Sequence, residues 1–591
     1  MRDNRSKKGK TQIAVIGLSC YYPGAKSPLE LWENILSQRR QFRRMPDVRL
    51  PIADYYDANL ACPDKTYQKK AAVIEGYQFD WLKHRIPKQV FEHTDIVQWL
   101  ALDVASRAIE DANLDLANIS KEKIGVVLGN TLTGEFTRAN TMRLRYPYVR
   151  RALKKSCLEL GQAHLFKELD GILENYYKSV FAPISEDTLA GGLANTIAGR
   201  ICNYFDFHGG GYIVDGACAS SLLAVINAAN YLVSGAMDLV ITGGVDVSLD
   251  TFELIGFAKT GALTPDEMRV YDKKAKGFIP GEGCGMVVLK RLEDAQKDGD
   301  KVYAVLEGWG ISSDGKGGIT APTSQWQGAA IKRAHQMANI DPKELDFIEG
   351  HGTGTTVGDK VELKGIALAL EAIKTQELRT CGVTSLKSLI GHTKAAAGIG
   401  AFIKTVIALN QRIVPPTAGI EQPNDIFYRE GKMLFPVLKG ITKQKTAMYA
   451  GVSAMGFGGI NSHCVLSSGF IESKKFKTAI SPKQLFVSNQ THEIFLFAGL
   501  SIEELVQNIE KIKDLAFGIS YAELSDLAAF NNINHLNNGK FRGAIIAQYP
   551  EELSRQLEQL LNSINQLSEN CLLYTSPSPR DATLSRMPSS A

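Results

Sequence analysis

The sequence has no long apolar run and no paired cysteines, and each absence narrows the class of protein. No stretch of about 18 consecutive apolar residues occurs, so we expect no transmembrane helix and no membrane partner. The basic start, MRDNRSKKGK, is not followed by an apolar core and does not resemble a secretory signal. The nine cysteines form no CxxC pair, which argues against a disulfide framework or a cysteine-rich zinc site. We therefore expect a protein of the reducing cytoplasm.

An excess of charge of one sign is also missing. The chain has 67 Lys and Arg against 63 Asp and Glu, so its net charge of +4 is too small to indicate a nucleic-acid partner. Hydrophobic residues make up 44% and charged residues 22%, which is typical of a soluble globular protein. At 591 residues the chain is too long for one ordinary core, so several domains are expected.

Apolar runs and helical periods alternate along the chain, first up to about residue 265 and then again to about 468. Short apolar runs predict buried strands in both halves, and helices are expected between them at 28–39, 95–112, 191–199 and 327–339. This alternation favours an α/β protein with buried sheets. The strands are expected at 12–18, 124–130, 212–214, 238–248, 283–291 and 303–312, and within 381–409 and 447–469. The run at 345–355 is expected to be a strand that continues into a Gly/Thr loop.

Two other regions have a different character. Residues 40–93 mix Pro, Asp and Tyr and are expected to form surface loops. Residues 136–180 form a more polar helical region with a basic stretch at 150–155. A solvated helix face or an insertion that contacts a second copy of the chain would each explain it.

The stretch GYIVDGACASSLLAVINAANYLV organises the first half. It predicts a strand, a turn at Asp215-Gly216 and a small-residue helix, with Cys218 where the helix begins. A thiol there faces free backbone N–H groups and the positive helix end, which favour the thiolate. This is the arrangement of a nucleophile elbow with cysteine in place of serine. The alternative is a buried structural cysteine.

Two histidines stand in comparable loops. His351 lies in EGHGTGT (349–355) and His392 in KSLIGHTKAAAG (387–398), each after an apolar strand. The glycines allow backbone N–H groups to approach a ligand, and the threonines add hydroxyl donors. Because the carboxyl ends of strands gather the sites of open α/β sheets, both loops are candidate site loops. Each histidine could instead be a satisfied structural side chain.

Taken in order, these segments resemble the ketosynthase (β-ketoacyl synthase) domain of type I polyketide synthases. The resemblance covers about residues 11–468 and includes IAVIGLSCYYPGA, GFIPGEGCGMVVLKR and GVSAMGFGGINSH. It implies a thiolase-like α/β fold, with two duplicated halves (about 12–265 and 266–468) in a layered α-β-α-β-α sandwich.

The resemblance also implies roles for the motif residues. Cys218 would accept the acyl chain, His351 and His392 would assist decarboxylation and stabilise the enolate, and Lys387 would organise the second histidine. Such chemistry needs no metal or redox cofactor, because a thiolate, two near-neutral imidazoles and oriented donors suffice.

The same resemblance implies the parts that hold the substrate. The oxyanion hole would use the backbone N–H groups of Cys218 and Phe457, and Thr353 and Thr355 would hold a phosphopantetheine arm. That arm belongs to an acyl carrier protein, which is the implied partner. The chain departs from the usual family motifs at Gly216, Ala219 and Gly350, without loss of a reactive group.

Several segments, among them FELIGFAKTGAL and DKTYQKKAAVIEGYQFDW, resemble the iterative enediyne-type synthases.

The expected domain layout is a basic lead-in (1–11), a ketosynthase (12–468), a small α/β linker domain (471–570) and a non-native or disordered tail (571–591). The chain has no GHSxG elbow of an acyltransferase and no GxDSL carrier motif, so it is expected to be an N-terminal fragment cut before an acyltransferase domain. The family is homodimeric through the strand before the nucleophile, here 211–214.

Other functions remain open at this point. A silent scaffold or chain-length partner would keep the fold without turnover, and a fatty-acid-type ketosynthase would share the chemistry. A Cys/His hydrolase would need one histidine oriented by Asn or Asp. A Cys-His-His zinc site is a further alternative.

Overall fold

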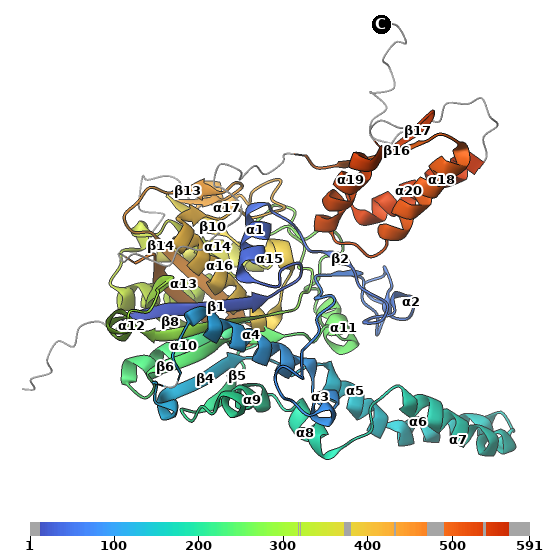
Figure 1. Cartoon of the computed structure of the whole chain (residues 1–591), viewed down its shortest axis with the longest axis horizontal. Helices are drawn as coiled ribbons and strands as arrows, with labels where there is room; N and C mark the ends of the chain where they lie inside the picture. The colour runs from blue at the N-terminus through green and yellow to red at the C-terminus, as the bar shows by residue number, and fades with distance from the viewer. Residues whose placement is uncertain are drawn as a thin grey trace, which may run out of the picture.

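The computed structural model describes residues 12–116, 118–316, 318–319, 321–370, 380–430, 433–469, 490–535 and 539–565. The expected lead-in (1–11), the expected tail (571–591) and part of the expected linker domain (471–489) lie outside the described residues. Figure 1 shows a layered body, a helical arm and a separate C-terminal unit.

An 11-stranded mixed sheet forms the frame of the body, and it consists of two units with the same strand order. The order is β5-β4-β6-β7-β1 in the first unit and β10-β9-β14-β15-β8 in the second. Antiparallel pairing of β1 with β8 joins the two units. The repeated strand order confirms the expected duplication, but β7 belongs to the first unit, so the expected boundary near residue 265 is wrong. The strands are β1 (Ile13–Tyr21), β4 (Ile124–Gly129), β5 (Gly211–Val214), β6 (Leu239–Asp246), β7 (Gly283–Arg291), β8 (Ala304–Ser313), β9 (Phe347–Glu349), β10 (Cys381–Thr384), β12 (Leu434–Pro436, at the edge), β14 (Tyr449–Gly456) and β15 (Ile460–Ser467).

Two small-residue helices, α10 (Ser220–Ser234) and α16 (Ala397–Gln411), form the central layer. They contact each other, and both contact strands of both units. Their backbones come close because small side chains face each other: a Cβ added at Gly398 would lie 2.9 Å from the backbone nitrogen of Leu222. Helices α4 (Ile96–Ala112) and α9 (Asn195–Phe205) cover the outer face of the first unit, and α13 (Ser324–Ala338) covers that of the second, packed with α14 (Gly358–Ala369).

Helix α10 is apolar because it lies in the central layer, in contact with strands of both units. The stretch Ala217–Ser234 is long and apolar enough to cross a membrane, with mean hydropathy 1.4, but 67% of it is buried inside the protein. Its composition therefore reflects its place between two sheets.

Most expected strands and helices are present, and the differences have local causes. Helix α10 begins at Ser220, two residues beyond Cys218. The helix expected at 191–199 is two helices, α8 (Glu186–Gly192) and α9, because Leu193 takes an extended conformation between them. The run at 345–355 forms β9 and then a loop, as expected, because its glycines turn the chain. The other short elements are α1 (Pro28–Leu36), β2 (Arg43–Arg44), α2 (Ile52–Tyr55), β3 (Lys70–Ala71), α3 (Lys88–Glu92), α11 (Thr251–Lys259), α12 (Leu292–Asp298), α15 (Lys387–Ile390), β11 (Ile413–Val414), α17 (Ile426–Arg429) and β13 (Ile441–Thr442).

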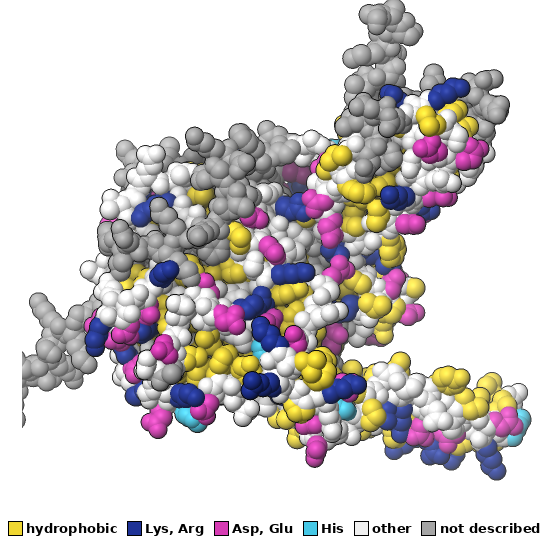
Figure 2. Space-filling view, viewed as in Figure 1, with side chains coloured by type: hydrophobic (Ala, Val, Ile, Leu, Met, Phe, Trp, Pro, Cys, Tyr) yellow, Lys and Arg dark blue, Asp and Glu magenta, His cyan; other side chains and the backbone are white. Residues whose placement is uncertain are grey.

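The polar region between β4 and β5 forms an arm of three helices, α5 (Glu135–Leu144), α6 (Tyr146–Glu159) and α7 (Ala163–Ser179), that extends from the body (Figure 1). The helices α6 and α7 pack against each other as a hairpin. Hydrophobic and basic side chains both lie on its visible surface (Figure 2). The exposed large hydrophobic residues of α7 are Leu169, Ile172 and Tyr176.

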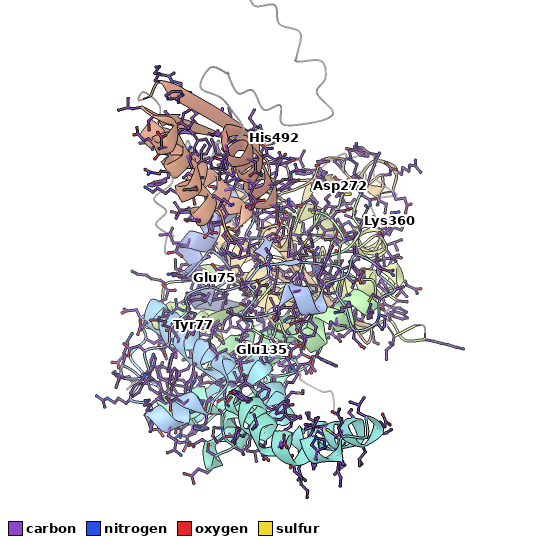
Figure 3. All side chains as sticks on the ribbon, turned by 90° about the vertical axis from the view of Figure 1, so that its right-hand side faces the viewer. Glu75, Tyr77, Glu135, Asp272, Lys360 and His492 are labelled. Carbon is purple, nitrogen blue, oxygen red and sulfur yellow. The ribbon has the colours of Figure 1, made fainter. Side chains whose placement is uncertain are left out.

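The C-terminal unit comprises β16 (Glu493–Gly499), α18 (Ile502–Leu515), α19 (Tyr521–His535), β17 (Phe541–Ala547) and α20 (Pro550–Asn565), and it has its own hydrophobic core. Figure 3 shows it, marked by His492, at the opposite end from the arm. Polar contacts join it to the body: Arg43 pairs with Glu523 at 2.8 Å, and the Tyr521 hydroxyl donates to Glu267 at 2.6 Å.

Candidate active site

The turn between β5 and α10 positions Cys218. Ala217, just before it, has φ 51°, a left-handed conformation that costs a non-glycine residue about 1–2 kcal/mol. Two side chains hold this turn: Asp215 accepts the N–H of Ala217 at 2.9 Å, and Ser220 Oγ accepts the N–H of Gly216 at 2.9 Å. The result is a sharp elbow that presents the thiol to a cavity of about 680 Å³.

Burial raises the pKa of the Cys218 thiol to about 12, and the charge of Lys387 only partly opposes this. The expectation that the helix start favours the thiolate is therefore wrong in direction. The helix begins two residues later, so Cys218 lies outside its first turn, and loss of hydration is the largest influence on the thiol. Near neutral pH the resting group is the thiol.

His351 enters the same cavity from the loop after β9. The buried carboxylate of Glu362 fixes this loop by accepting the backbone N–H groups of His351 at 2.5 Å and Gly352 at 2.8 Å. The ring is fixed separately, because its Nδ1 accepts the N–H of Met455 at 3.3 Å. In the neutral ring the proton is therefore on Nε2.

His392 reaches the cavity from the loop between α15 and α16. Its ring packs edge to face on Phe278, with centroids 5.0 Å apart. Its Nδ1 accepts the backbone N–H of Lys394 at 3.1 Å, so Nε2 carries the proton of this ring too.

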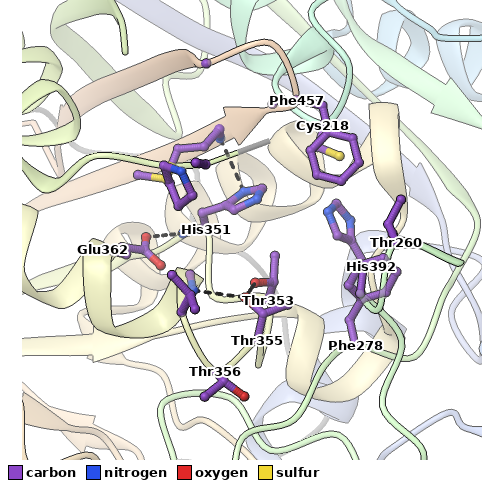
Figure 4. A pocket seen from close by; sticks show the side chains of 18 of the residues that line it. Cys218, Thr260, Phe278, His351, Thr353, Thr355, Thr356, Glu362, His392 and Phe457 are labelled. Atoms are coloured by element: carbon purple, nitrogen blue, oxygen red, sulfur yellow. Dashed lines mark hydrogen bonds between the residues drawn. The ribbon is translucent and has the colours of Figure 1, made fainter. Parts of the chain in front are cut away.

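The two imidazoles lie beside each other near Cys218 (Figure 4), with ring centroids 5.5 Å apart and planes at 83°. Burial, and then the charge of Lys387, lowers the pKa of both well below the usual value for histidine. Both rings are therefore neutral near pH 7, and each can present one N–H donor to a ligand in the cavity.

The predicted lysine, Lys387, is buried at the start of α15. Its ammonium donates to the backbone carbonyl of His351. Burial lowers its pKa, and the charges of Glu362 and Glu349 oppose that shift. The hydrogen bond of the ammonium thus goes to the loop of the first histidine, whereas the resemblance assigns Lys387 to the second.

The remaining predicted residues line the same cavity. The hydroxyls of Thr353 and Thr355 lie 3.0 Å apart on its wall (Figure 4). Phe457, in the turn between β14 and β15, is 45% exposed. Within the described part of the chain, no hydrogen bond uses the backbone N–H of Cys218 or Phe457. All of the predicted site residues except Lys387 thus line one cavity, and Lys387 contacts the backbone of His351 behind it.

Sequence reasoning missed the buried ionic groups that support the site. Glu362 holds the His351 loop, while Lys394 pairs with Asp246 and Glu253 behind the His392 loop. Lys394 stands two residues after His392, which is a visible signal. The acids are distant in the sequence, and no pattern of spacing points to them.

Two of the alternative functions gain no support from this geometry. Among the described residues, no three His, Cys, Asp or Glu side chains form a group that could hold a metal ion. The Nδ1 atoms of both site histidines accept backbone N–H groups, whereas the hydrolase alternative requires orientation by Asn or Asp. The arrangement instead offers a nucleophile opposite two neutral donors.

Comparison with known proteins agrees with this arrangement. Residues 10–295 match the family described as "Beta-ketoacyl synthase, N-terminal domain", and residues 303–421 match "Beta-ketoacyl synthase, C-terminal domain". The chain is 33% identical over 532 residues to one component of the polyunsaturated fatty acid synthase of Thraustochytrium sp., a match that covers 86% of this chain and 18% of that protein. It is 29% identical over 560 residues to polyketide synthase PksL of Bacillus subtilis, covering 93% of this chain and 11% of that protein.

Among solved structures, the ketosynthase from module 6 of the bacillaene synthase of Bacillus subtilis matches with a TM-score of 0.64 and 27% identity. The match covers 93% of this chain and 85% of that one. The chain thus spans less than a fifth of the two curated relatives but most of a solved ketosynthase. It belongs to the β-ketoacyl synthase family, whose members form carbon–carbon bonds by acyl transfer.

Proposed function

We propose that this chain catalyses decarboxylative Claisen condensation of a malonyl thioester with an acyl chain held on Cys218. The observation that carries the proposal is the meeting of one thiol and two Nε2-protonated imidazoles in a single cavity. The proposed steps use no metal or redox cofactor.

In the first half-reaction the Cys218 sulfur attacks an incoming thioester. The acyl group moves to Cys218, and the thiol proton moves to the departing phosphopantetheine thiol, so the exchange is balanced. The backbone N–H groups of Cys218 and Phe457 are aimed at the oxyanion formed on the way. Their freedom from other hydrogen bonds within the described residues supports this role.

In the second half-reaction a malonyl thioester loses CO₂ and leaves an enolate. The Nε2–H groups of His351 and His392 donate to the enolate oxygen, where the negative charge develops. Its carbon then attacks the Cys218 thioester and expels the Cys218 thiolate, which gives a β-ketoacyl thioester. The thiolate takes up a proton from solvent, and this restores the thiol for the next acyl transfer. Lys387 supports the His351 loop through the carbonyl that it contacts.

The substrates are proposed to arrive on the phosphopantetheine of an acyl carrier protein. The hydroxyls of Thr353 and Thr355 would hold that arm at the cavity wall. An acyltransferase domain would supply the malonyl group. We further propose a cytoplasmic, iterative synthase of the enediyne or polyene type. This proposal rests on the sequence segments that resemble enediyne-type synthases and on the similarity to a polyunsaturated fatty acid synthase.

We propose domain limits of 12–468 for the ketosynthase and 471–570 for a linker domain. The separate core of the C-terminal unit supports the second of these. A homodimer through β5 is also proposed, because β5 is an edge strand of the sheet and its outer side can pair with a second copy. Sedimentation at micromolar concentration tests this, and a monomer would contradict it.

The function is tested by mixing the purified chain with an acyl thioester and a malonyl-carrier protein. Mass spectrometry should find the β-ketoacyl product and the loss of CO₂. A silent scaffold would bind the carriers without either change. Hydrolysis of the acyl thioester with no new carbon–carbon bond would favour the hydrolase.

A further inference from the structure

The backbone of Lys394 is strained at the point where it meets a site histidine. Its φ is 49°, in the left-handed region that residues other than glycine seldom adopt. In this conformation its N–H points at Nδ1 of His392, 3.1 Å away. Such strain persists only where the surroundings over-determine the conformation, and it concentrates at functional sites.

The side chain of Lys394 supplies that constraint. Its ammonium lies 2.7 Å from Asp246 Oδ1 and 2.7 Å from Glu253 Oε2, and all three side chains are almost fully buried. The Ser248 hydroxyl lies 2.9 Å from both carboxylates. Asp246 also accepts the N–H of Ala395 at 3.2 Å, which ties down the next peptide unit.

The two acids come from separate parts of the body. Asp246 ends β6 in the middle of the first sheet unit, and Glu253 belongs to α11. The same helix carries Phe257, which lines the cavity that the thiol enters. The ammonium therefore fixes residue 394 to a strand and to a cavity wall at once.

The backbone of His392 is held by other groups. Its N–H donates to the carbonyl of Ile279 at 2.8 Å, and its carbonyl accepts the N–H of Gly281 at 3.0 Å. Loss of the lysine would thus leave the position of His392 in place but release its ring. Without an N–H on Nδ1, the ring is free to rotate and to move its proton to Nδ1, away from the cavity.

We propose that Lys394 is a positioning residue for condensation, because its buried ion pairs with Asp246 and Glu253 hold its N–H against His392 and keep the Nε2–H of that ring aimed into the cavity. The inference rests on the proposed function. It predicts a defect confined to the half-reaction that uses the enolate, since acyl transfer to Cys218 does not use His392.

The test compares Lys394→Gln with Lys290→Gln. Lys290 is a matched control, because it is also nearly buried between two carboxylates, Asp298 at 2.5 Å and Asp300 at 2.7 Å, but lies on β7 away from the cavity. Acylation of Cys218 and release of CO₂ from a malonyl thioester are measured separately. Lys394→Gln should acylate within about twofold of the wild type, with an unchanged KM for the malonyl thioester. Its kcat for condensation should fall by about 10–100-fold, as when an oxyanion donor is misplaced.

The Lys290→Gln variant should retain both half-reactions. Equal condensation by the two folded variants would overturn the proposal, and so would an equal loss of acylation and condensation in Lys394→Gln. If Lys394→Gln fails to fold, Glu253→Gln tests the proposal instead, because this change leaves the ion pair between Lys394 and Asp246 intact. A loss of about 3–10-fold in condensation alone supports the proposal, and no loss contradicts it. A wild-type chain that fails to condense would instead contradict the proposed function.

Discussion

His351 and His392 face each other at 83° with ring centroids 5.5 Å apart, and each has its Nδ1 occupied by a backbone N–H. Both neutral rings therefore carry their proton on Nε2, although their planes are nearly perpendicular. Two Nε2–H groups can then meet one oxygen atom, which is what the oxygen of an enolate requires. Several expected outcomes depend on it.

Replacement of either histidine should separate the two half-reactions. His351→Ala and His392→Ala are each expected to acylate Cys218 but to lose about 10²–10³-fold in condensation, since one donor to the enolate is removed. Acyl-enzyme mass and CO₂ release measure the two steps. Normal product formation by either variant would remove that histidine from the mechanism.

The Cys218 thiol should react slowly and in proportion to hydroxide. Burial raises its pKa to about 12, so the thiolate fraction, and with it alkylation by iodoacetamide, should rise about tenfold per pH unit between pH 7 and 9. The rate is followed by the mass of the Cys218 peptide. A plateau by pH 8 would show that the N-terminus of α10 outweighs burial.

Buried neutral histidines should make stability depend on pH in a defined direction. Burial lowers the pKa of His463 well below its usual value, whereas the unfolded chain binds a proton at this side chain from about pH 6.5 downward. Its contribution to folding is therefore present above pH 6.5 and is lost as the pH falls. The free-energy difference between wild type and His463→Asn should shrink by about 1.4 kcal/mol from pH 8 to pH 5.5. Denaturant unfolding at both pH values measures it, and a constant difference would contradict the lowered pKa.

The end of β14 should tolerate no side chain at Gly456, its last residue. A Cβ there would lie 2.2 Å from the carbonyl oxygen of Gly216, in the elbow that carries Cys218. Gly456→Ala is expected to lower both the melting temperature and the rate of acylation. Gly171→Ala is the control, because no atom lies within 4 Å of its added Cβ, and the change should stabilise α7 by up to about 1 kcal/mol. Equal behaviour of the two variants would argue against a tight elbow.

The sequence predicted the frame of this protein well because its signals are local. The apolar runs that became β1, β4 and β6 are bounded by turn residues, and the small-residue pattern of α10 and α16 reflects their close packing. The site loops were likewise visible as glycines around Cys218, His351 and His392.

What the sequence could not supply is long-range electrostatics. Lys394 and Asp246 pair although they are far apart in the sequence, and the left-handed φ of Lys394 cannot be predicted from a lysine in a small-residue run. The same holds for the pKa of Cys218, because it depends on how deeply the thiol is buried. The motif around Cys218 predicted a helix that begins near the thiol. It could not predict how strongly desolvation raises the pKa of that thiol.

The most direct test of the account is to map the acyl group after reaction with an acyl thioester. Intact mass and peptide mapping should place one acyl group on Cys218 and none on Cys218→Ala, while Cys62→Ala, a change at a free cysteine outside the cavity, should load normally. An acyl adduct that persists in folded Cys218→Ala, or that maps to another residue, would contradict the central claim.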